Sequence, residues 1–333
     1  MEKYVKKNFW SEKRVLVTGG TGFLGRHVVE KLEEAGCSKV FVARRREHDL
    51  TQEDQVKTMF RDHPADIVIH LAGLVGGIGA NRSWPADFFY QNLMMGVLTV
   101  DQARKNGVEK VVCAGAGCGY PEAAPIPLKE EFFWDGFPQP DSAPYSLAKR
   151  ILHIQSLAYW KQYKFPVIVT IPGNIYGPYD NFDLDNAHVI PALVRKFVEA
   201  ADEGRSHIEL WGSGSPTRDF VYAGDVAEGM LRAAETYNEA ALVNLSSGSE
   251  CSIRDVAEML SEIVGFRGKI QWNTNQPEGQ KRRMFDVSKA ERDFGFRART
   301  EIKKGLQLTM QWYRENRTDA RNTFALCGTG KES

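Results

Sequence analysis

The stretch "RVLVTGGTGFLG" at residues 14–25 constrains the fold most, because it joins a β-branched run to regularly spaced glycines. Gly19, Gly22 and Gly25 stand three residues apart, directly after a predicted strand and at the start of a predicted helix. Glycines permit a tight turn and a close backbone approach, and the free N–H groups of a helix N-terminus attract a pyrophosphate. The spacing therefore predicts a dinucleotide-binding βαβ unit.

The first half of the chain alternates short apolar runs with helical segments, which indicates βαβ units and a parallel sheet. The predicted strands cover residues 14–20, 39–45, 65–73, 110–117 and 165–177, and the predicted crossover helices include 51–63, 85–106 and 145–163. Beyond them, loops rich in Asn, Asp, Pro and Gly at 173–187 and 211–219 interrupt the helical stretches 190–203, 225–236 and 252–265. We therefore predict a Rossmann-type doubly wound α/β fold with a smaller C-terminal α/β substrate domain.

The expected domain organisation has three parts. Residues 1–175 are predicted to form the dinucleotide-binding domain, with later segments returning to its sheet. Residues 176–317 are predicted to form the substrate domain, and residues 318–333 a loose polar tail.

Composition excludes several classes of partner. The 333 residues include 43 basic and 43 acidic side chains, so no global field attracts nucleic acid or an anionic membrane. Five scattered cysteines without CxxC spacing form neither a disulfide framework nor a metal-ligand set. The sequence has no apolar run of about 18 residues and no signal peptide. We expect a cytoplasmic protein with no metal, no nucleic-acid partner and no membrane partner.

The end of the second predicted strand, "ARRRE" at 43–47, bears on the cofactor. An acidic residue there usually meets a free ribose 2′-hydroxyl, whereas arginines suit a 2′-phosphate. Arg44, Arg45 or Arg46 fits that role, and Arg45 is the preferred candidate. The cofactor is therefore expected to be NADP(H) rather than NAD, although three arginines also suit an ordinary solvated edge.

The motif "YSLAK" places Tyr145 and Lys149 four residues apart, on one helix face. A nearby ammonium and a cationic nicotinamide are expected to depress the pKa of the phenol toward neutrality, so that it exchanges a proton with a ketone or hydroxyl. Together with the glycine motif, this pair resembles the extended short-chain dehydrogenase/reductase family. In that family the dinucleotide binds to the N-terminal part and a nucleotide sugar to the C-terminal part.

Three further stretches, 71–95, 174–197 and 211–227, are similar to the GDP-L-fucose synthase group of that family, and the likeness runs over about residues 14–316. These enzymes are 3,5-epimerases and 4-reductases of GDP-4-keto-6-deoxymannose. The resemblance implies NADPH as hydride donor, a GDP-sugar substrate, and a homodimer packed through helices 85–106 and 145–163. It also implies that Cys118 and His188 are the acid/base pair of epimerisation, and that Tyr145 with Lys149 serves the hydride step.

Epimerisation requires an acid/base pair of this kind, because inverting a carbon beside a ketone needs a base on one face and an acid on the other. A thiol and an imidazole both titrate close enough to neutral pH for this task. The simpler interpretations are that Cys118 is a small buried apolar residue and that His188 is only hydrogen-bonded at a helix start. The other cysteines (Cys37, Cys113, Cys251 and Cys327) are interpreted as structural.

The resemblance also implies two sets of binding residues. The cofactor set is Gly19, Gly22, Phe23, Leu24, Gly25, Arg45, Leu71, Ala72, Tyr145, Lys149 and His188. The substrate set is Asn174, Val189, Lys196, Trp211, Arg218 and Arg283. Guanidinium forks suit a diphosphate, and an indole offers a packing surface to a base or sugar.

One departure from the family bears on the activity. The family carries serines before the cysteine, as in "GSSC", and the first completes a Ser–Tyr–Lys triad, whereas this chain has "GAGC" with Ala116 and Gly117. Losing a preorganised donor costs on the order of 3 kcal/mol in catalysis. Three hypotheses remain: the epimerase/reductase with Tyr145 sufficient, a redox-neutral nucleotide-sugar epimerase that retains NAD(P), and a non-catalytic dinucleotide-binding sensor.

Overall fold

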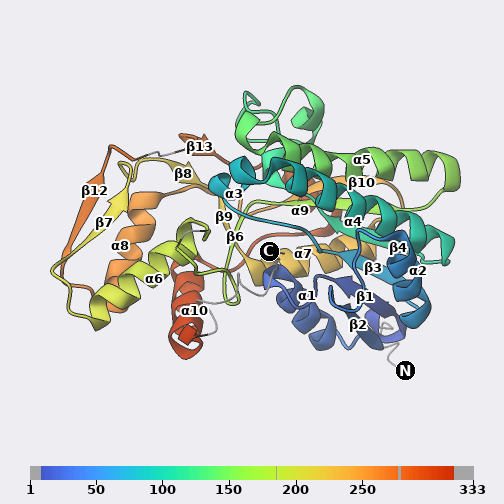
Figure 1. Ribbon diagram of the computed structural model, residues 1–333, viewed down its shortest axis with the longest axis horizontal. Helices are drawn as coiled ribbons and strands as arrows, with labels where there is room; N and C mark the ends of the chain where they lie inside the picture. Colours follow the sequence, from blue (N-terminus) through green and yellow to red (C-terminus); the bar gives the residue numbers. More distant parts are fainter. Residues whose placement is uncertain (1–8, 185, 277–278, 319–333) are drawn as a thin grey trace, which may run out of the picture.

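A six-stranded parallel sheet forms the centre of the protein, in the order β10-β5-β4-β3-β1-β2 (Figure 1). The computed structural model describes residues 9–184, 186–276 and 279–318. The strands of this sheet are β1 (Arg14–Thr18), β2 (Lys39–Ala43), β3 (Ile67–His70), β4 (Lys110–Ala114), β5 (Val167–Pro172) and β10 (Ala241–Leu245). The predicted doubly wound parallel sheet is confirmed. The predicted tail, apart from Thr318, and Cys327 lie outside the described residues.

Helices cover both faces of the sheet. One face packs against α2 (Glu53–Asp62), α4 (Pro85–Lys105) and α5 (Ala143–Tyr163), and the other against α1 (Phe23–Glu34), α7 (Ala223–Thr236) and α9 (Ser288–Phe294). Successive strand residues point to opposite faces, so Leu16 joins the first core while Val15 and Val17 join the second. Both faces are buried, which explains why the strands are apolar throughout rather than alternating.

The sheet draws on two distant stretches of chain. Its edge strand β10 pairs in parallel with β5, from Ala241 opposite Ile168 to Leu245 opposite Pro172. The preceding helix α7 packs on α1 across the same face. β1 lies between β2 and β3, so the order in which successive strands are added to the sheet reverses at β1. In open α/β sheets, ligands bind in the crevice at such a switch point.

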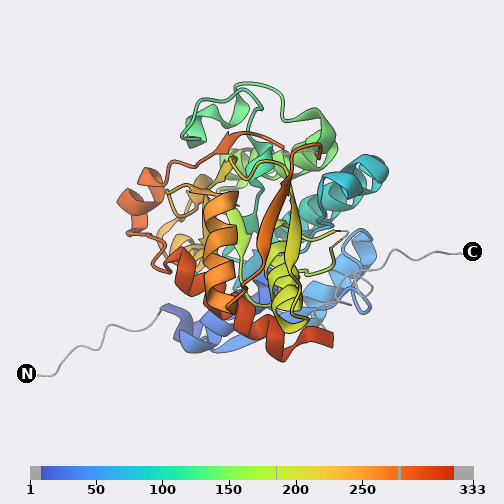
Figure 2. The same cartoon turned by 90° about the vertical axis from the view of Figure 1, so that its left-hand side faces the viewer.

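The remaining elements form a smaller unit at one end of the molecule, on the left in Figure 1 and facing the viewer in Figure 2. Its helices are α6 (Val189–Asp202), α8 (Ile253–Val264) and α10 (Ile302–Glu315), around a separate apolar core. Its short strands are β6 (Asn174–Tyr176), β7 (His207–Trp211), β8 (Thr217–Arg218), β9 (Phe220–Tyr222), β11 (Cys251–Ser252), β12 (Lys269–Asn273) and β13 (Arg282–Arg283). β8 lies where a loop was predicted, and β6 lies where the predicted strand 165–177 overlaps the predicted loop 173–187, because strands of two or three residues carry no readable periodicity.

Short helices complete the description: α3 (Ile78–Ser83) and the 3-10 helices η1 (Phe9–Glu12), η2 (Gly117–Gly119), η3 (Glu130–Trp134) and η4 (Pro140–Ser142). Within the described residues, every helix is too short or too polar to cross a membrane.

Candidate active site

The glycine motif forms a backbone cradle at the carboxyl end of β1. Gly19 has a φ of +71°, and a Cβ there would stand 2.7 Å from the Ala72 nitrogen. A Cβ on Gly25 would stand only 2.0 Å from the Gly19 carbonyl oxygen. Gly22 precedes the first residue of α1, and no side chain caps that helix start. The space and the open N–H groups near Phe23 and Leu24 fit a pyrophosphate.

The three arginines after β2 lie beside this cradle, since Ala43 pairs with Thr18 in the sheet register. β2 ends at Ala43, two residues earlier than predicted, and the chain turns as the amides of Glu47 and His48 both donate to the Arg44 carbonyl. All three arginines are exposed on this turn, and Arg46 pairs with Glu47. The position suits a cofactor phosphate, and the role of Arg45 stays a prediction.

The tyrosine, lysine and cysteine of the predicted catalytic set come together between α5 and the turn after β4. Lys149 is 4% exposed, and its Nζ donates to the Ala114 carbonyl at 3.2 Å. Cys118 lies in η2, four residues after Ala114, close enough that a thiolate there acts electrostatically on both Lys149 and Tyr145. The helical spacing of "YSLAK" therefore delivers the phenol and the ammonium to the same place as the thiol.

In the protein without its cofactor, the pKa of Tyr145 is raised rather than depressed, and the depression expected beside a cationic nicotinamide stays a prediction. Burial raises the pKa of Tyr145 strongly, and a charge on Cys118 raises it further. Burial also lowers the pKa of Lys149, against the opposing effect of Cys113 and Cys118. Desolvation thus outweighs the attraction between phenolate and ammonium. Tyr145 therefore holds its proton, which is the form that a proton donor to a ketone oxygen requires.

Sequence reasoning missed a buried amide beside this group. Asn92 on α4 is 2% exposed and exchanges hydrogen bonds with the backbone of Leu74, at 3.1 and 3.0 Å. A Cβ on Gly73 would stand 2.9 Å from the Asn92 Oδ1 and 3.3 Å from the Lys149 Nζ. Asn92 therefore fixes the segment after β3 next to Lys149. Its only signal in the sequence is a polar residue within an otherwise largely apolar helical stretch.

His188 occupies the position immediately before α6, in the smaller unit. Its surface is exposed, yet surrounding protein lowers the pKa of its imidazole by desolvation. A lowered pKa favours the neutral imidazole, which is able to accept a proton. Among the described residues, no hydrogen bond joins the His188 and Cys118 side chains, so the structure does not itself pair them.

Two predicted substrate arginines meet in the smaller unit. Arg218 on β8 lies opposite Arg283 on β13 in the parallel register. Burial lowers the pKa of both guanidinium groups, and the charge of Arg283 lowers that of Arg218 further. Arg283 also donates to the carbonyl of Gly117, next to Cys118. Two half-buried, mutually repelling cations beside the thiol are chemically suited to a diphosphate or a similar anion, and their role as substrate residues stays a prediction.

The other substrate candidates form a second group, along α6 and β7. The Lys196 Nζ donates to the Glu209 carbonyl at 3.3 Å, which ties α6 to β7 two residues before Trp211. Trp211 is 62% exposed and Val189 is 42% exposed. Asn174 instead belongs with the arginines, because its side chain donates to the Asp219 carbonyl at 3.2 Å. An exposed indole and a free apolar side chain are available to pack on a ligand.

Of the two positions where the family carries serine, Ala116 has no hydroxyl and Gly117 has no space for a side chain. Ala116 is buried, and a Cβ on Gly117 would stand 2.7 Å from the ring of Phe285 and 3.3 Å from the Pro172 carbonyl oxygen. Phe285 is 1% exposed and lies two residues after Arg283. Phe285 therefore fills the space beside Gly117, a contact that the sequence did not reveal.

The glycine cradle, the Tyr145–Lys149 pair and the doubly wound sheet together define a dinucleotide-dependent enzyme of the short-chain type. The chain belongs to the NAD dependent epimerase/dehydratase family, whose model matches residues 15–245.

Individual relatives narrow this class further. The chain is 37% identical over 304 residues to the probable GDP-L-fucose synthase 1 of Oryza sativa subsp. japonica, covering 91% of this chain and 92% of the relative. A GDP-L-fucose synthetase structure from Naegleria fowleri superposes with a TM-score of 0.86 at 28% identity, covering 92% and 95% of the two chains. The NADP-bound GDP-mannoheptose C4 reductase of Campylobacter jejuni superposes with a TM-score of 0.82 at 29% identity, covering 91% and 99%.

Proposed function

We propose that the protein is an NADPH-dependent GDP-sugar 3,5-epimerase/4-reductase that acts on a GDP-4-keto-6-deoxyhexose or a related GDP-4-keto sugar. One observation carries the proposal: Cys118 lies beside Tyr145 and Lys149 on one side and beside Arg283, paired with Arg218, on the other. A thiol, a proton-donating phenol and an anion site therefore converge at the end of β4. The names of the relatives, which are GDP-sugar synthases and reductases, support the same conclusion.

In the epimerisation step, Cys118 and His188 act on carbons next to the ketone. One of the two groups removes a proton from the carbon, and the other returns a proton to the opposite face. Neutral His188 is able to accept a proton, because surrounding protein atoms desolvate its imidazole and lower its pKa. The guanidinium groups of Arg283 and Arg218 hold the diphosphate and thereby orient the sugar.

In the reduction step, bound NADPH supplies a hydride to the ketone carbon. Tyr145 keeps its proton in the buried site and donates it to the ketone oxygen. Lys149 lies one helical turn away and stabilises the phenolate that remains. The cradle at Gly19, Gly22 and Gly25 holds the pyrophosphate of the cofactor, and Arg45 on the exposed turn binds its 2′-phosphate.

We also propose a cytoplasmic homodimer joined through α4 and α5. These two helices lie side by side in Figure 1, and they expose large apolar side chains toward solvent. The exposed residues are Phe89, Tyr90, Ile154, Leu157 and Tyr163. Contiguous exposed apolar side chains mark interaction surfaces, and α4 and α5 of a second copy would pack on this pair to form a four-helix arrangement.

The test of the function is NADPH oxidation with GDP-4-keto-6-deoxymannose. Absorbance at the NADPH band should fall with this substrate, and Tyr145→Phe should remove the fall. Solvent deuterium appearing at C3 or C5 without any NADPH oxidation would instead support the redox-neutral epimerase. Binding of NADPH without either reaction would support the sensor.

Substitutions at Ala116 and Gly117, where the family carries serine, test the reduction step more directly. Ala116→Ser restores the hydroxyl and should raise the reductive rate, by about tenfold or more if the missing donor limits the reaction. Gly117→Ser is the matched control, because its Cβ meets Phe285 at 2.7 Å, and it should lower activity. An unchanged rate in Ala116→Ser means that another group already supplies the donor.

A further inference from the structure

Asp219 lies between β8 and β9 and is completely buried. Its Oδ1 accepts hydrogen bonds from the Ser247 amide at 3.0 Å and the Ser247 hydroxyl at 2.5 Å. Its Oδ2 accepts from the amides of Gly248 at 3.3 Å and Phe285 at 3.2 Å. One carboxyl group thus holds the chain just after β10 and the chain just after β13.

The backbone of the same residue completes the connection. The Asp219 amide donates to the Arg283 carbonyl at 3.0 Å, and the Asp219 carbonyl accepts from the Asn174 amide at 3.0 Å. The Asn174 side chain donates to that carbonyl as well. Asn174, Arg218 and Arg283 come from three separate stretches of chain, and all three meet at residue 219.

The arrangement of the arginines needs such an anchor. Arg218 and Arg283 repel each other, and β8 and β13 are strands of only two residues each. A two-residue pairing supplies few ladder bonds to oppose that repulsion. Asp219 reaches the arginines through the hydrogen-bonded backbone: its carboxylate accepts from the Phe285 amide, and its own amide donates to the Arg283 carbonyl.

We propose that Asp219 is a positioning residue for the diphosphate of the nucleotide sugar. It clamps β13 to β8 before the substrate arrives, so that the two guanidinium groups already lie side by side. This inference rests on the proposed function, because it assigns the arginine pair to a nucleotide diphosphate. Preorganisation of this kind raises affinity by removing the cost of ordering the site on binding.

The test compares Asp219→Asn with Asp255→Asn by calorimetric titration with GDP, pyrophosphate and NADPH. Asn keeps the volume of the side chain but places an N–H₂ group against backbone donors. The dissociation constants of GDP and pyrophosphate should rise by about tenfold or more, while that of NADPH changes by less than about twofold. Asp255 is exposed and caps α8 through Ser252, so its variant removes another hydrogen-bonded carboxylate, one that holds neither arginine strand, and should leave all three constants unchanged.

A double variant separates positioning from general support. In an Arg218→Ala background, the further effect of Asp219→Asn on pyrophosphate affinity should shrink, because one of the two groups that Asp219 aligns is gone. An equal loss of NADPH, GDP and pyrophosphate affinity in Asp219→Asn would overturn the proposal, and so would unchanged pyrophosphate affinity. If the unaltered protein binds pyrophosphate but not GDP, the proposed function fails and the Asp219 test still stands.

Hydrogen exchange in the unaltered protein tests the same inference without any variant. The Phe285 amide donates to a buried carboxylate, so it should already be protected without ligand and gain little protection from pyrophosphate. An amide that exchanges freely until pyrophosphate is added would show that the ligand, not Asp219, orders β13, and would overturn the proposal.

Discussion

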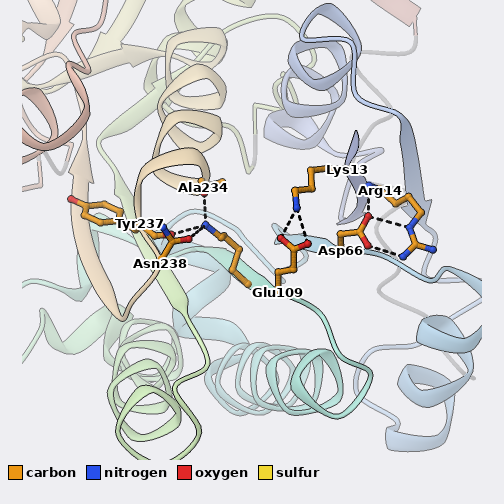
Figure 3. Close-up of polar contacts among 8 residues, drawn as sticks. Lys13, Arg14, Asp66, Glu109, Ala234, Tyr237 and Asn238 are labelled. Carbon is orange, nitrogen blue, oxygen red and sulfur yellow. Dashed lines mark hydrogen bonds and ion pairs between the residues drawn. The ribbon is translucent and has the colours of Figure 1, made fainter. Parts of the chain in front are cut away.

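The amino and carboxyl ends of the strands in the central sheet differ in how fully a buried lysine is hydrogen-bonded. Lys110 lies at the amino end and Lys149 beside the carboxyl end. Lys110 and Lys149 are each 4% exposed, and burial lowers the pKa of both. At the amino end, the Lys110 Nζ donates to the carbonyls of Ala234 and Tyr237 and to the Asn238 side chain, at 2.7 to 2.8 Å (Figure 3). At the carboxyl end, Lys149 has a single hydrogen bond within the described chain, at 3.2 Å.

Other charged side chains at the two ends of the sheet differ in the same way: they are paired at the amino end and repel each other beside the carboxyl end. Figure 3 shows Lys13 paired with Glu109 and Arg14 paired with Asp66 at the amino end. Beside the carboxyl end lie two arginines of the smaller unit that repel each other, and α1 begins there without a side-chain cap. An ammonium has three donors, so Lys149 keeps hydrogen-bonding capacity that Lys110 has already used. The polar groups at the amino end therefore contribute to stability, whereas those at the carboxyl end remain available to bind a ligand.

The largest expected effect comes from Lys149→Met. The reductive kcat should fall on the order of a thousandfold, because Tyr145 loses the cation that stabilises its phenolate. The free energy of unfolding should stay equal or rise, since a buried amine with one hydrogen bond is replaced by an apolar side chain. Steady-state kinetics and urea unfolding on the same sample check both parts. A large loss of stability would show that Lys149 resembles Lys110 after all.

Lys110→Met should show the reverse pattern. Two buried carbonyls and the exposed Asn238 side chain lose their donor, so the free energy of unfolding should fall by about 3 kcal/mol, while kcat and KM stay unchanged. Lys13→Met is the matched control at the same end of the sheet. Its partner Glu109 is partly exposed, so the loss there should stay under about 1 kcal/mol.

Gly25→Ala tests the cradle. The new Cβ would stand 2.0 Å from the Gly19 carbonyl oxygen, so the turn must shift and NADPH affinity should fall by about a hundredfold. Gly107→Ala is the control, because Gly107 has a φ of +75° and open space around it. That variant should cost stability by about 1 kcal/mol and leave NADPH titrations unaltered. Equal NADPH affinity in both variants contradicts the assignment of the cradle.

The smallest predicted effect is a pH dependence that originates at the end of β3. Burial lowers the pKa of His70 to about 3, and its Nδ1 lies 2.8 Å from the Thr18 hydroxyl. The unfolded chain takes up a proton below about pH 6.5 and the folded one does not, so this stability is complete above that pH and is lost as the pH falls toward 3. His70→Asn should reduce the slope of unfolding free energy between pH 6 and pH 4 by up to about 1.4 kcal/mol per pH unit. An unchanged slope in urea titrations would contradict a neutral His70.

Much of the frame was predictable from the sequence, because it depends on local patterns. The run before Gly19 and the spacing of Tyr145 and Lys149 each report on one strand or one helix. The Tyr145 pKa was not predictable, since desolvation depends on everything packed around the ring. Nor were the contacts of Phe285 with Gly117 and of Asp219 with Arg283, which join residues far apart in the sequence through strands too short to leave a pattern.

The late position of β10 in the sequence affects how the protein folds during synthesis. A nascent chain that has reached residue 175 contains the glycine cradle but not the edge strand or α7. The apolar residues Val15, Val17 and Ile69 then lack part of the helical layer that covers them. This helical layer also includes α9, so the cofactor-binding half completes its fold only after Phe294, in a chain of 333 residues, has been synthesised. Until then, the growing chain presents bare sheet surface of the kind that chaperones bind.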